Sequence, residues 1–235
     1  SYTSVSVGGN VEPALLTGLT DENANPYATW TYDTSALAAS SEHAGGVDRH
    51  TFTYRKDAAG RITGSNVTNP LGAVTEYTFQ NLLGANRVST ISQPLIAGLS
   101  RSFTYDANGN VASRTDFNGR LTTYTYDLTR NLEIRRLEAS GQAEARTISS
   151  EWHASYRLPL RIAEPLKRTL FTYDDSGNTL SRSEQATTDG NGSLGFAAPV
   201  VGSPRTWTFT YNSLGQVLSA DGPRSDLTDL TTYGY

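Results

Sequence analysis

The side chains best suited to catalysis in this sequence of 235 residues are carboxylates that return at intervals. Asp106, Asp127 and Asp174 each end the phrase aromatic-Thr-Tyr-Asp. A glycosidase needs two carboxylates on opposite sides of one bond. A residue that recurs in unit after unit is better explained by a turn, which an Asp side chain opens by accepting backbone hydrogen bonds. We therefore expect no catalytic residue here, nor at the carboxylates that the repeat leaves unassigned, Asp21, Glu22, Asp221 and Asp226.

Histidines offer metal or acid–base chemistry, and the sequence contains three. His43, His50 and His153 are too scattered to form a recognisable metal site. Glu151 and His153 are two residues apart and would share one face of a strand, where acid–base chemistry is conceivable. An ordinary cross-strand polar pair is the commoner use of such residues. We expect no metal and no cofactor.

A glycine-rich stretch at 190–195 matches the G-x-G-x-x-G pattern of dinucleotide-binding loops. That pattern binds a pyrophosphate only between a strand and a helix N-terminus, and residues 196–199 open no convincing helix. A flexible loop is the better interpretation. The wider segment 187–205 has the Gly, Pro and Ser content of a long exposed loop.

Composition sets the outer limits of the fold and function. The absence of Cys excludes disulfides, thiol catalysis and Cys-ligated metals. A net charge of -4, with acids and bases interspersed, gives no basic stripe for nucleic acid. No apolar run approaches the ~18 residues of a membrane span. Abundant Thr, Ser, Gly, Asn and Tyr favour a β-rich soluble chain.

The elements that position these residues come from a repeat. An aromatic-x-Tyr phrase recurs along the chain, mostly 21 to 26 residues apart. A gap of 47 residues follows Tyr126, and Trp152 lies 26 residues into it and restores the period. A gap of 38 residues before Tyr211 requires an insertion, which the loop at 187–205 supplies. The anchors are Tyr32, Tyr54, Phe79, Tyr105, Tyr126, Trp152, Tyr173, Tyr211 and Tyr235.

Each unit predicts two antiparallel strands and two turns. Phe103 and Tyr105 would share one face of a strand, with Thr104 on the other. Asp106 would open a turn, and Gly109 would supply the positive φ of a type I turn with a G1 bulge. Stacked units would bury a continuous aromatic face. The residues expected to hold the repeat are Tyr32, Tyr54, Gly60, Tyr105, Asp106, Gly109, Tyr126, Asp127, Tyr173, Asp174, Gly177, Tyr211 and Gly215.

These units resemble the Rhs/YD-repeat family, whose unit reads approximately Tyr-Asp-x-x-Gly-Arg/Asn-Leu followed by a second glycine. Residues 105–111 and 173–178 match that unit, and residues 126–159 and 221–235 resemble segments of the bacterial Rhs branch. The resemblance covers nearly the whole chain. It implies an all-β fold of repeated antiparallel hairpins, in a curved, spirally wound strip that is part of a hollow shell. Residues 1–235 would form a single repeat array within a larger shell.

The resemblance also implies a function. Such shells enclose a C-terminal toxin before delivery, in type VI secretion effectors, contact-dependent toxins and insecticidal Tc complexes, whereas animal teneurins use similar shells for adhesion. The implied partners are the toxin domain, the rest of the shell and secretion machinery such as a VgrG-like spike or a chaperone. The implied location is secreted or delivered at the bacterial cell surface. The expected role is structural, without enzymatic turnover.

Carbohydrate binding or surface adhesion is the alternative function. The chain has 13 Tyr and 3 Trp, and exposed aromatic rings on a β-surface commonly grip sugars. Two aromatics per unit on one face favour a structural ladder instead, because neighbouring units would pack against that face.

Overall fold

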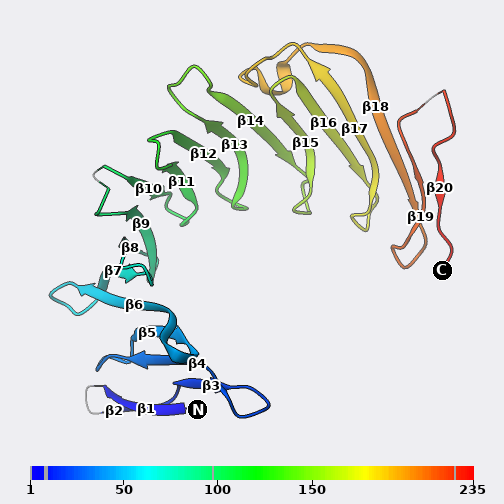
Figure 1. Ribbon diagram of the computed structural model, residues 1–235. Coiled ribbons are helices and arrows are strands. Elements are labelled where there is room, and N and C mark those ends of the chain that lie inside the picture. Colours follow the sequence, from blue (N-terminus) through cyan, green and yellow to red (C-terminus); the bar gives the residue numbers. More distant parts are fainter. Residues whose placement is uncertain (1, 8–9, 97, 225) are drawn as a thin grey trace. The chain divides into compact units, whose positions relative to one another are not determined.

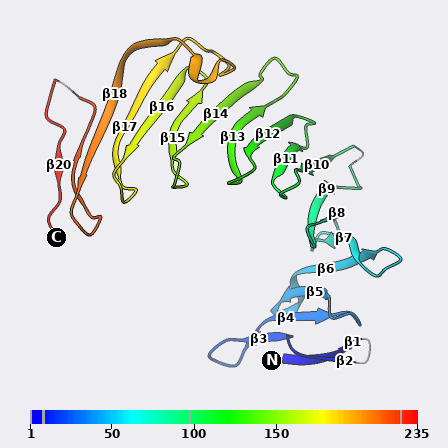
Figure 2. The same ribbon diagram turned by 180° about the vertical axis from the view of Figure 1, so that it is seen from behind.

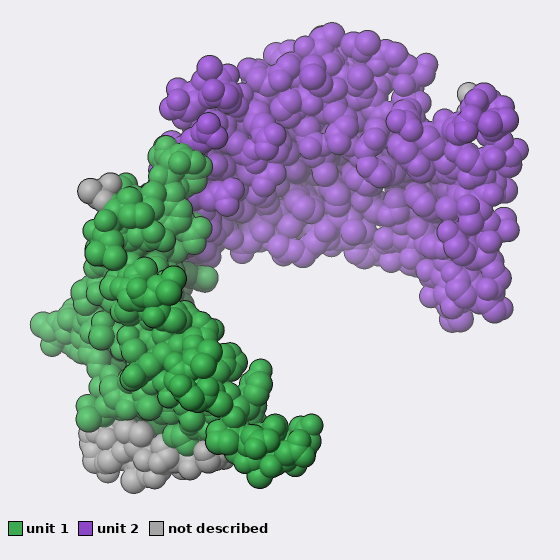
Figure 3. All heavy atoms as spheres, viewed as in Figure 1, with its two compact units in different colours: residues 1–104, 116–119 green, residues 105–115, 120–235 purple. Residues whose placement is uncertain are grey.

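The computed structural model describes residues 2–7, 10–96, 98–224 and 226–235, and the fold is all-β (Figure 1). Within those residues the chain forms twenty strands and two short 3-10 turns. It divides into two compact units (Figure 3): unit 1 holds residues 1–104 and 116–119, and unit 2 holds residues 105–115 and 120–235.

Unit 1 is a series of antiparallel strands that pair in sequence order. β1 and β2 form one hairpin, and β3 to β10 form a sheet in which each strand pairs with the next. Its elements are β1 (Tyr2–Val7), β2 (Asn10–Leu16), β3 (Gly18–Thr20), β4 (Pro26–Tyr32), β5 (Ala38–His43), η1 (Ala44–Gly46), β6 (Val47–Lys56), β7 (Ile62–Thr68), β8 (Val74–Leu82), β9 (Ala85–Ser92) and β10 (Ser100–Tyr105).

Unit 2 continues the same plan, and its strands follow one another around an arc (Figure 1). Each strand from β11 to β20 pairs antiparallel with the next. Its elements are β11 (Val111–Thr115), β12 (Leu121–Asp127), β13 (Leu132–Glu138), β14 (Arg146–Trp152), β15 (Pro159–Glu164), β16 (Lys167–Tyr173), β17 (Thr179–Thr187), η2 (Gly195–Ala197), β18 (Val200–Tyr211), β19 (Val217–Asp221) and β20 (Thr231–Thr232).

The two faces of the sheet follow the predicted alternation. In β16, Phe171 and Tyr173 are half-buried and stack with ring centroids 6.3 Å apart, while Thr172 between them is exposed. The Thr residue meets a Ser on the neighbouring strand, with 2.6 Å between the Thr172 and Ser181 hydroxyls. The same hydroxyl pair joins Thr31 to Ser40 and Thr210 to Ser219. We call the two sides the aromatic face and the threonine face.

From β12 to β17, unit 2 is a single layer of sheet. No second sheet lies over β12–β17 from the front or from behind (Figures 1 and 2). Among the residues whose burial the structure describes, no large side chain is fully buried. The buried apolar side chains recorded there are Ala28, Ile91, Leu132, Ala163 and Ala198. Cross-strand pairing, more than a packed core, therefore has to hold these units together.

The insertion differs from the exposed, flexible loop that its composition predicted. Thr187 belongs to β17 and residues 200–205 belong to β18, so the loop itself covers 188–199. It is docked on unit 2: the N–H of Thr147 donates to the carbonyl of Asn191 at 2.7 Å, and the N–H of Leu166 donates to that of Asp189, also at 2.7 Å. The two bonds satisfy one backbone N–H group in β14 and one just before β16. Without the loop, water would have to bind these donors.

Candidate functional site

The repeated unit is built around a turn opened by Asp106. The Asp106 Oδ1 atom accepts the N–H groups of Asn108 and Asn110, both at 2.9 Å. The N–H of Gly109 donates to the Asp106 carbonyl at 3.1 Å, and Gly109 has φ 81°. The predicted role of Asp106 as turn opener and the positive φ of Gly109 are confirmed.

The same turn recurs through both units. Asp57, Asp174 and Asn212 each accept two backbone N–H groups through the side-chain oxygen, between 2.8 and 3.0 Å. The glycines three residues later have φ between 77° and 85°; they are Gly60, Gly177 and Gly215. Asp127 opens a variant of this turn, in which its Oδ1 atom accepts the N–H of Thr129 at 2.9 Å and Asn131 takes the left-handed conformation.

The predicted turn at residues 70–73 has this geometry as well: Asn69 opens it and Gly72 has φ 79°. Two further turns of the same geometry, opened by Asp21 and Asp33, were missed in the sequence. In these two an alanine takes the left-handed position: Ala24 has φ 62° and Ala36 has φ 59°. The signal that could have found them is the Asp or Asn opener itself, because the search required a glycine three residues later.

Hydrogen bonding lowers the pKa of three of the turn carboxylates, those of Asp57, Asp106 and Asp174. The pKa of Asp57 is lowered by the backbone N–H and side chain of Arg61, and that of Asp174 by the side chain and backbone N–H of Asn178. For Asp106, desolvation raises the pKa, but the combined hydrogen bonds from Asn110 and its neighbours outweigh it and the pKa is lowered. A carboxylate held as an acceptor in this way serves the turn, since it is not poised to donate a proton.

The anchor tyrosines make a second repeated contact, which sequence reasoning missed. Each hydroxyl donates to a backbone carbonyl at the end of a strand that precedes it in the sequence, at 2.7 to 3.0 Å. The pairs are Tyr32 to Leu16, Tyr54 to Ala38, Tyr126 to Val111, Tyr173 to Pro159 and Tyr211 to Thr179. For Tyr54, Tyr126, Tyr173 and Tyr211 the bond ties the aromatic strand to the strand before it, at a point where ladder pairing gives way to a turn. Tyr32 in β4 reaches the end of β2 instead.

Trp152 replaces a tyrosine in this series. Its indole N–H donates to the carbonyl of Glu133 at 2.7 Å, which confirms that the 47-residue gap contains one more unit. Phe79 has no hydroxyl and cannot make the bond. Tyr105 ends β10, and Tyr235 lies beyond β20 with 74% of its surface exposed.

Partial burial accompanies the tyrosine contact. Desolvation raises the pKa of Tyr54, Tyr126, Tyr173 and Tyr211 above its usual value. The hydroxyls therefore keep their protons at physiological pH and remain hydrogen-bond donors. Rings held in this way are committed to the sheet, which favours the structural ladder over a sugar-binding platform.

In unit 2 the turns after the anchors are also joined to one another. Asn108 Nδ2 donates to the carbonyl of Leu128 at 2.7 Å, and the guanidinium of Arg130 donates to the carbonyls of His153 and Tyr156 at 2.6 and 2.8 Å. The Tyr156 hydroxyl donates to the carbonyl of Asp175 at 2.5 Å. We call this series, residues 106–110, 127–131, 153–158 and 174–178, the turn row.

Other features weighed for chemistry have structural partners. Glu151 pairs across strands with Arg161, with 2.6 Å between its Oε2 and the Arg161 Nε atom, as expected for an ordinary polar pair. His153 does not share the strand face with Glu151, because β14 ends at Trp152 and His153 opens the next turn. Over residues 190–195 the chain opens no α-helix, only the three-residue turn η2.

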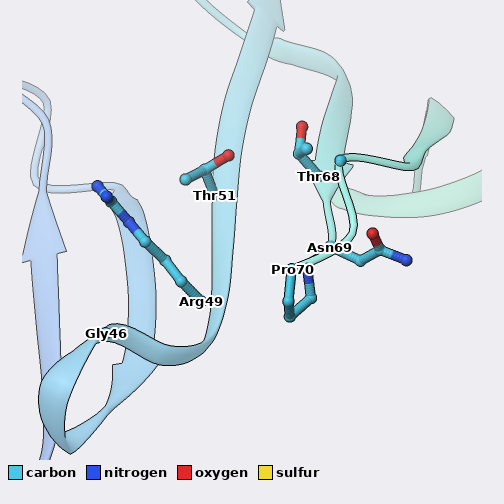
Figure 4. Close-up of a pocket in the computed structure, with 7 residues that line it drawn as sticks. Gly46, Arg49, Thr51, Thr68, Asn69 and Pro70 are labelled. Carbon is cyan, nitrogen blue, oxygen red and sulfur yellow. The ribbon is translucent and has the colours of Figure 1, made fainter.

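A cleft in unit 1, of about 380 Å³, lies beside Gly46, Arg49, Thr51 and Asn69 (Figure 4). Arg49 lies 3.4 Å from Glu42, so its charge is already paired. Within the described ranges, no three His, Asp or Glu side chains are grouped so as to hold a metal ion. Both helical turns of the described chain are three residues long, far short of a membrane-crossing helix.

The geometry defines a class of protein: an array of β-hairpins whose recurring polar and aromatic residues hold turns and strand ends. Residues 105–143 match the model of the family described as RHS Repeat. This span contains the turn at Asp106, the Tyr126 contact and the link from Asn108 to Leu128. Residues 105–143 are therefore similar to an Rhs repeat, and the turn and hydroxyl geometry of this span recurs in both units.

Solved structures with similar strand arrangements include two crystal structures, TcdB2-TccC3-TEV and TcdB2-TccC3-Cdc42. The first is 16% identical with a TM-score of 0.38, and the match covers 90% of this chain and 13% of that chain. The second is 15% identical with a TM-score of 0.33, covering 91% and 15%. A Photorhabdus luminescens Tc holotoxin pore with mutated TccC3 is 14% identical with a TM-score of 0.32, covering 85% and 13%. No curated protein matches the sequence.

Proposed function

We propose that the chain is a wall segment of an Rhs shell that encloses a C-terminal toxin for secretion and delivery. The observation that carries the proposal is the single-layer sheet whose successive strands are tied together by the tyrosine hydroxyls. A layer without a packed core is a poor globular domain, but it is a suitable barrier when its edges are paired with further repeats. The role is steric: the wall separates the toxin from the cell that makes it.

We propose further that the segment performs no turnover. The residues that recur are occupied in turns and in strand-end hydrogen bonds, which supports a structural use for each of them. Among delivery routes, we propose a type VI secretion effector, with the rest of the shell, the toxin and a spike or chaperone as partners. This choice rests on the resemblance of residues 126–159 and 221–235 to the bacterial Rhs branch.

The test begins with the gene that encodes the chain, read on both sides of residues 1 and 235. The encoded protein is then purified, imaged by cryo-electron microscopy and treated with protease. We expect further repeats around a closed cavity, and a C-terminal domain that resists protease until the shell is denatured. Repeats flanked by a signal peptide and a surface anchor, with no enclosed domain, would overturn the proposal in favour of an adhesin.

A further inference from the structure

The links between neighbouring turns stop after the turn opened by Asp174. The next turn at this end of the strands is opened by Asn212 and covers residues 212–216. Within the described residues, no hydrogen bond joins these two turns. A cleft of about 520 Å³ lies between them instead, and Asp174, Ser176, Asn178 and Asn212 are among the residues that line it.

Side chains fill the corresponding space between the first two turns of the turn row, 106–110 and 127–131. Asn108 Nδ2 donates to the carbonyl of Leu128 at 2.7 Å and to the Oδ1 atom of Asn131 at 2.8 Å. Asn108 is the second residue after its turn opener, and Asn131 is the left-handed residue of its own turn. Two amide side chains, one from each turn, therefore occupy the space.

Shorter residues stand at both of these places beside the cleft. Ser176 is the second residue after Asp174, and Gly215 is the left-handed residue of the turn 212–216, with φ 77°. A Cβ atom at residue 215 would lie 3.4 Å from the Oδ1 atom of Asn178, so this oxygen lies close to the place where a side chain is missing. The cleft is thus the space that two amide side chains fill elsewhere.

The cleft presents a negative charge and a hydrogen-bond acceptor. Hydrogen bonds, that from the Asn178 side chain foremost, lower the pKa of Asp174, so its carboxylate is ionised at neutral pH. No salt bridge within the described ranges includes Asp174. Asn178 donates its Nδ2 group to Asp174 at 2.8 Å, which leaves its Oδ1 atom as an acceptor beside residue 215. The cleft therefore suits a ligand that carries a positive charge and donates hydrogen bonds.

The turn row shows which chemical group fits between such turns. Arg130 donates from two guanidinium nitrogens to the carbonyls of His153 and Tyr156, at 2.6 and 2.8 Å. Arg157 donates in the same way to the carbonyls of Arg130 and Asn131, at 3.1 and 3.2 Å. A guanidinium is planar, stays charged at physiological pH and has five N–H donors. The residues that line the cleft include neither Arg nor Lys.

We propose that the cleft beside Asp174 is a binding site for an arginine side chain of a partner protein. The guanidinium replaces the two amide side chains that the cleft lacks. Its charge pairs with Asp174, and its N–H groups donate to the Oδ1 atom of Asn178 and to the carbonyl of Ser213. Ser213 directly follows its turn opener, as Leu128 does in the linked pair of turns. A partner segment with one exposed arginine then docks at this end of the strands without any change in the turns.

The test titrates the 235-residue chain with N-acetyl-arginine-N-methylamide and follows backbone amide shifts by NMR. We expect saturable shifts at Ser176, Asn178 and Gly215. The citrulline counterpart of the probe, which has a neutral urea group of the same shape, should bind about fivefold more weakly, the upper end for one exposed ion pair. Shifts that do not saturate, or equal binding of the citrulline counterpart, would overturn the proposal. Equal binding of the lysine counterpart would also overturn it, because the site would then select any cation.

Asp174→Asn removes the charge and keeps a turn opener, since Asn69 and Asn212 open turns of the same geometry. We expect this variant to bind the arginine probe about fivefold more weakly and the citrulline probe as the parent does. Asp106→Asn is the matched control, because Asn108 already fills the space beside that turn. An equal loss of arginine binding in Asp106→Asn would assign the effect to overall charge and would overturn the proposal.

A second variant, Ser176→Asn, leaves the charge of Asp174 in place and tests the position of the probe. It introduces at residue 176 the amide side chain that closes the space at Asn108. We expect it to abolish saturable binding of the arginine probe. Binding as tight as that of the parent would show that the probe does not occupy the cleft.

Discussion

The turn row and the docked insertion both satisfy backbone hydrogen-bonding groups at the ends of strands, but they do so with different kinds of contact. In the turn row one geometry is produced repeatedly by different residues, since the opener is an Asp in one turn and a histidine in another. In the insertion each contact occurs once, and the backbone of residue 192 lies against the carbonyl of Thr147. An exposed turn that recurs tolerates substitution of its residues, whereas a close backbone–backbone contact that occurs once does not.

The largest effect is expected at Gly192. This residue has φ 74°, and a Cβ atom there would lie 2.1 Å from the Thr147 carbonyl oxygen, so backbone would have to move. We expect Gly192→Ala to lower the free energy of unfolding by about 3 kcal/mol, from the clash and the left-handed conformation together. Urea unfolding measures this change. Gly190→Ala is the matched control, because a Cβ at residue 190 meets nothing within 4 Å.

A loss for Gly192→Ala no greater than that for Gly190→Ala would show that the insertion is not docked as described. The insertion would then tolerate a side chain at a left-handed glycine as well as the turn row does, and the two regions would not differ in this respect.

The second effect, at Gly177, tests the turn row. Its φ is 85°, but a Cβ there would meet only side-chain carbons of Leu158 and Tyr156, at 3.5 Å and beyond. Gly177→Val should therefore cost about 2 kcal/mol, for the left-handed backbone alone. Gly177→Asn should cost less, because Asn tolerates this conformation. Equal melting temperatures for Gly177→Val and the parent would contradict the prediction.

The third effect, at Tyr126, tests the tie between strands. Tyr126→Phe leaves the ring in place and removes the donor to the Val111 carbonyl, which should cost about 1 kcal/mol. Tyr124→Phe is the matched control on the same face, where no hydroxyl bond is recorded among the described residues, and should be nearly neutral. If both variants unfold at the same urea concentration, the hydroxyl does not stabilise the sheet.

Local features were predictable because they depend on neighbours in sequence. The period, the paired aromatics and an Asp followed three residues later by a Gly predict the hairpin at 103–111, since a turn is decided by a few adjacent residues. Tyr126 was identified as an anchor for the same reason. The target of its hydroxyl could not be predicted, because it depends on which carbonyl the register places opposite.

Non-local contacts account for the other differences. The Gly, Pro and Ser content of 187–205 indicates a loop but not whether the loop packs on the sheet, so it did not reveal the bond from Leu166 to Asp189. His153 was weighed as a strand residue, because its use as a turn opener depends on where β14 ends. Sequence patterns predict the repeated unit well, but they do not predict which of its backbone groups bond to segments distant in sequence.

The smallest effect has the opposite sign and lies in unit 1. Ala36 holds the left-handed position of the turn opened by Asp33, with φ 59°. A glycine adopts this conformation without the cost that an L side chain pays, and part of the gain is offset by the greater freedom of glycine in the unfolded chain. We expect Ala36→Gly to raise the free energy of unfolding by about 0.5 kcal/mol. Ala59→Gly is the control, because Gly60 already supplies the positive φ of its turn, and only the entropic loss should remain. If Ala36→Gly destabilises the chain as much as Ala59→Gly does, then the left-handed position is not what makes glycine recur in these turns.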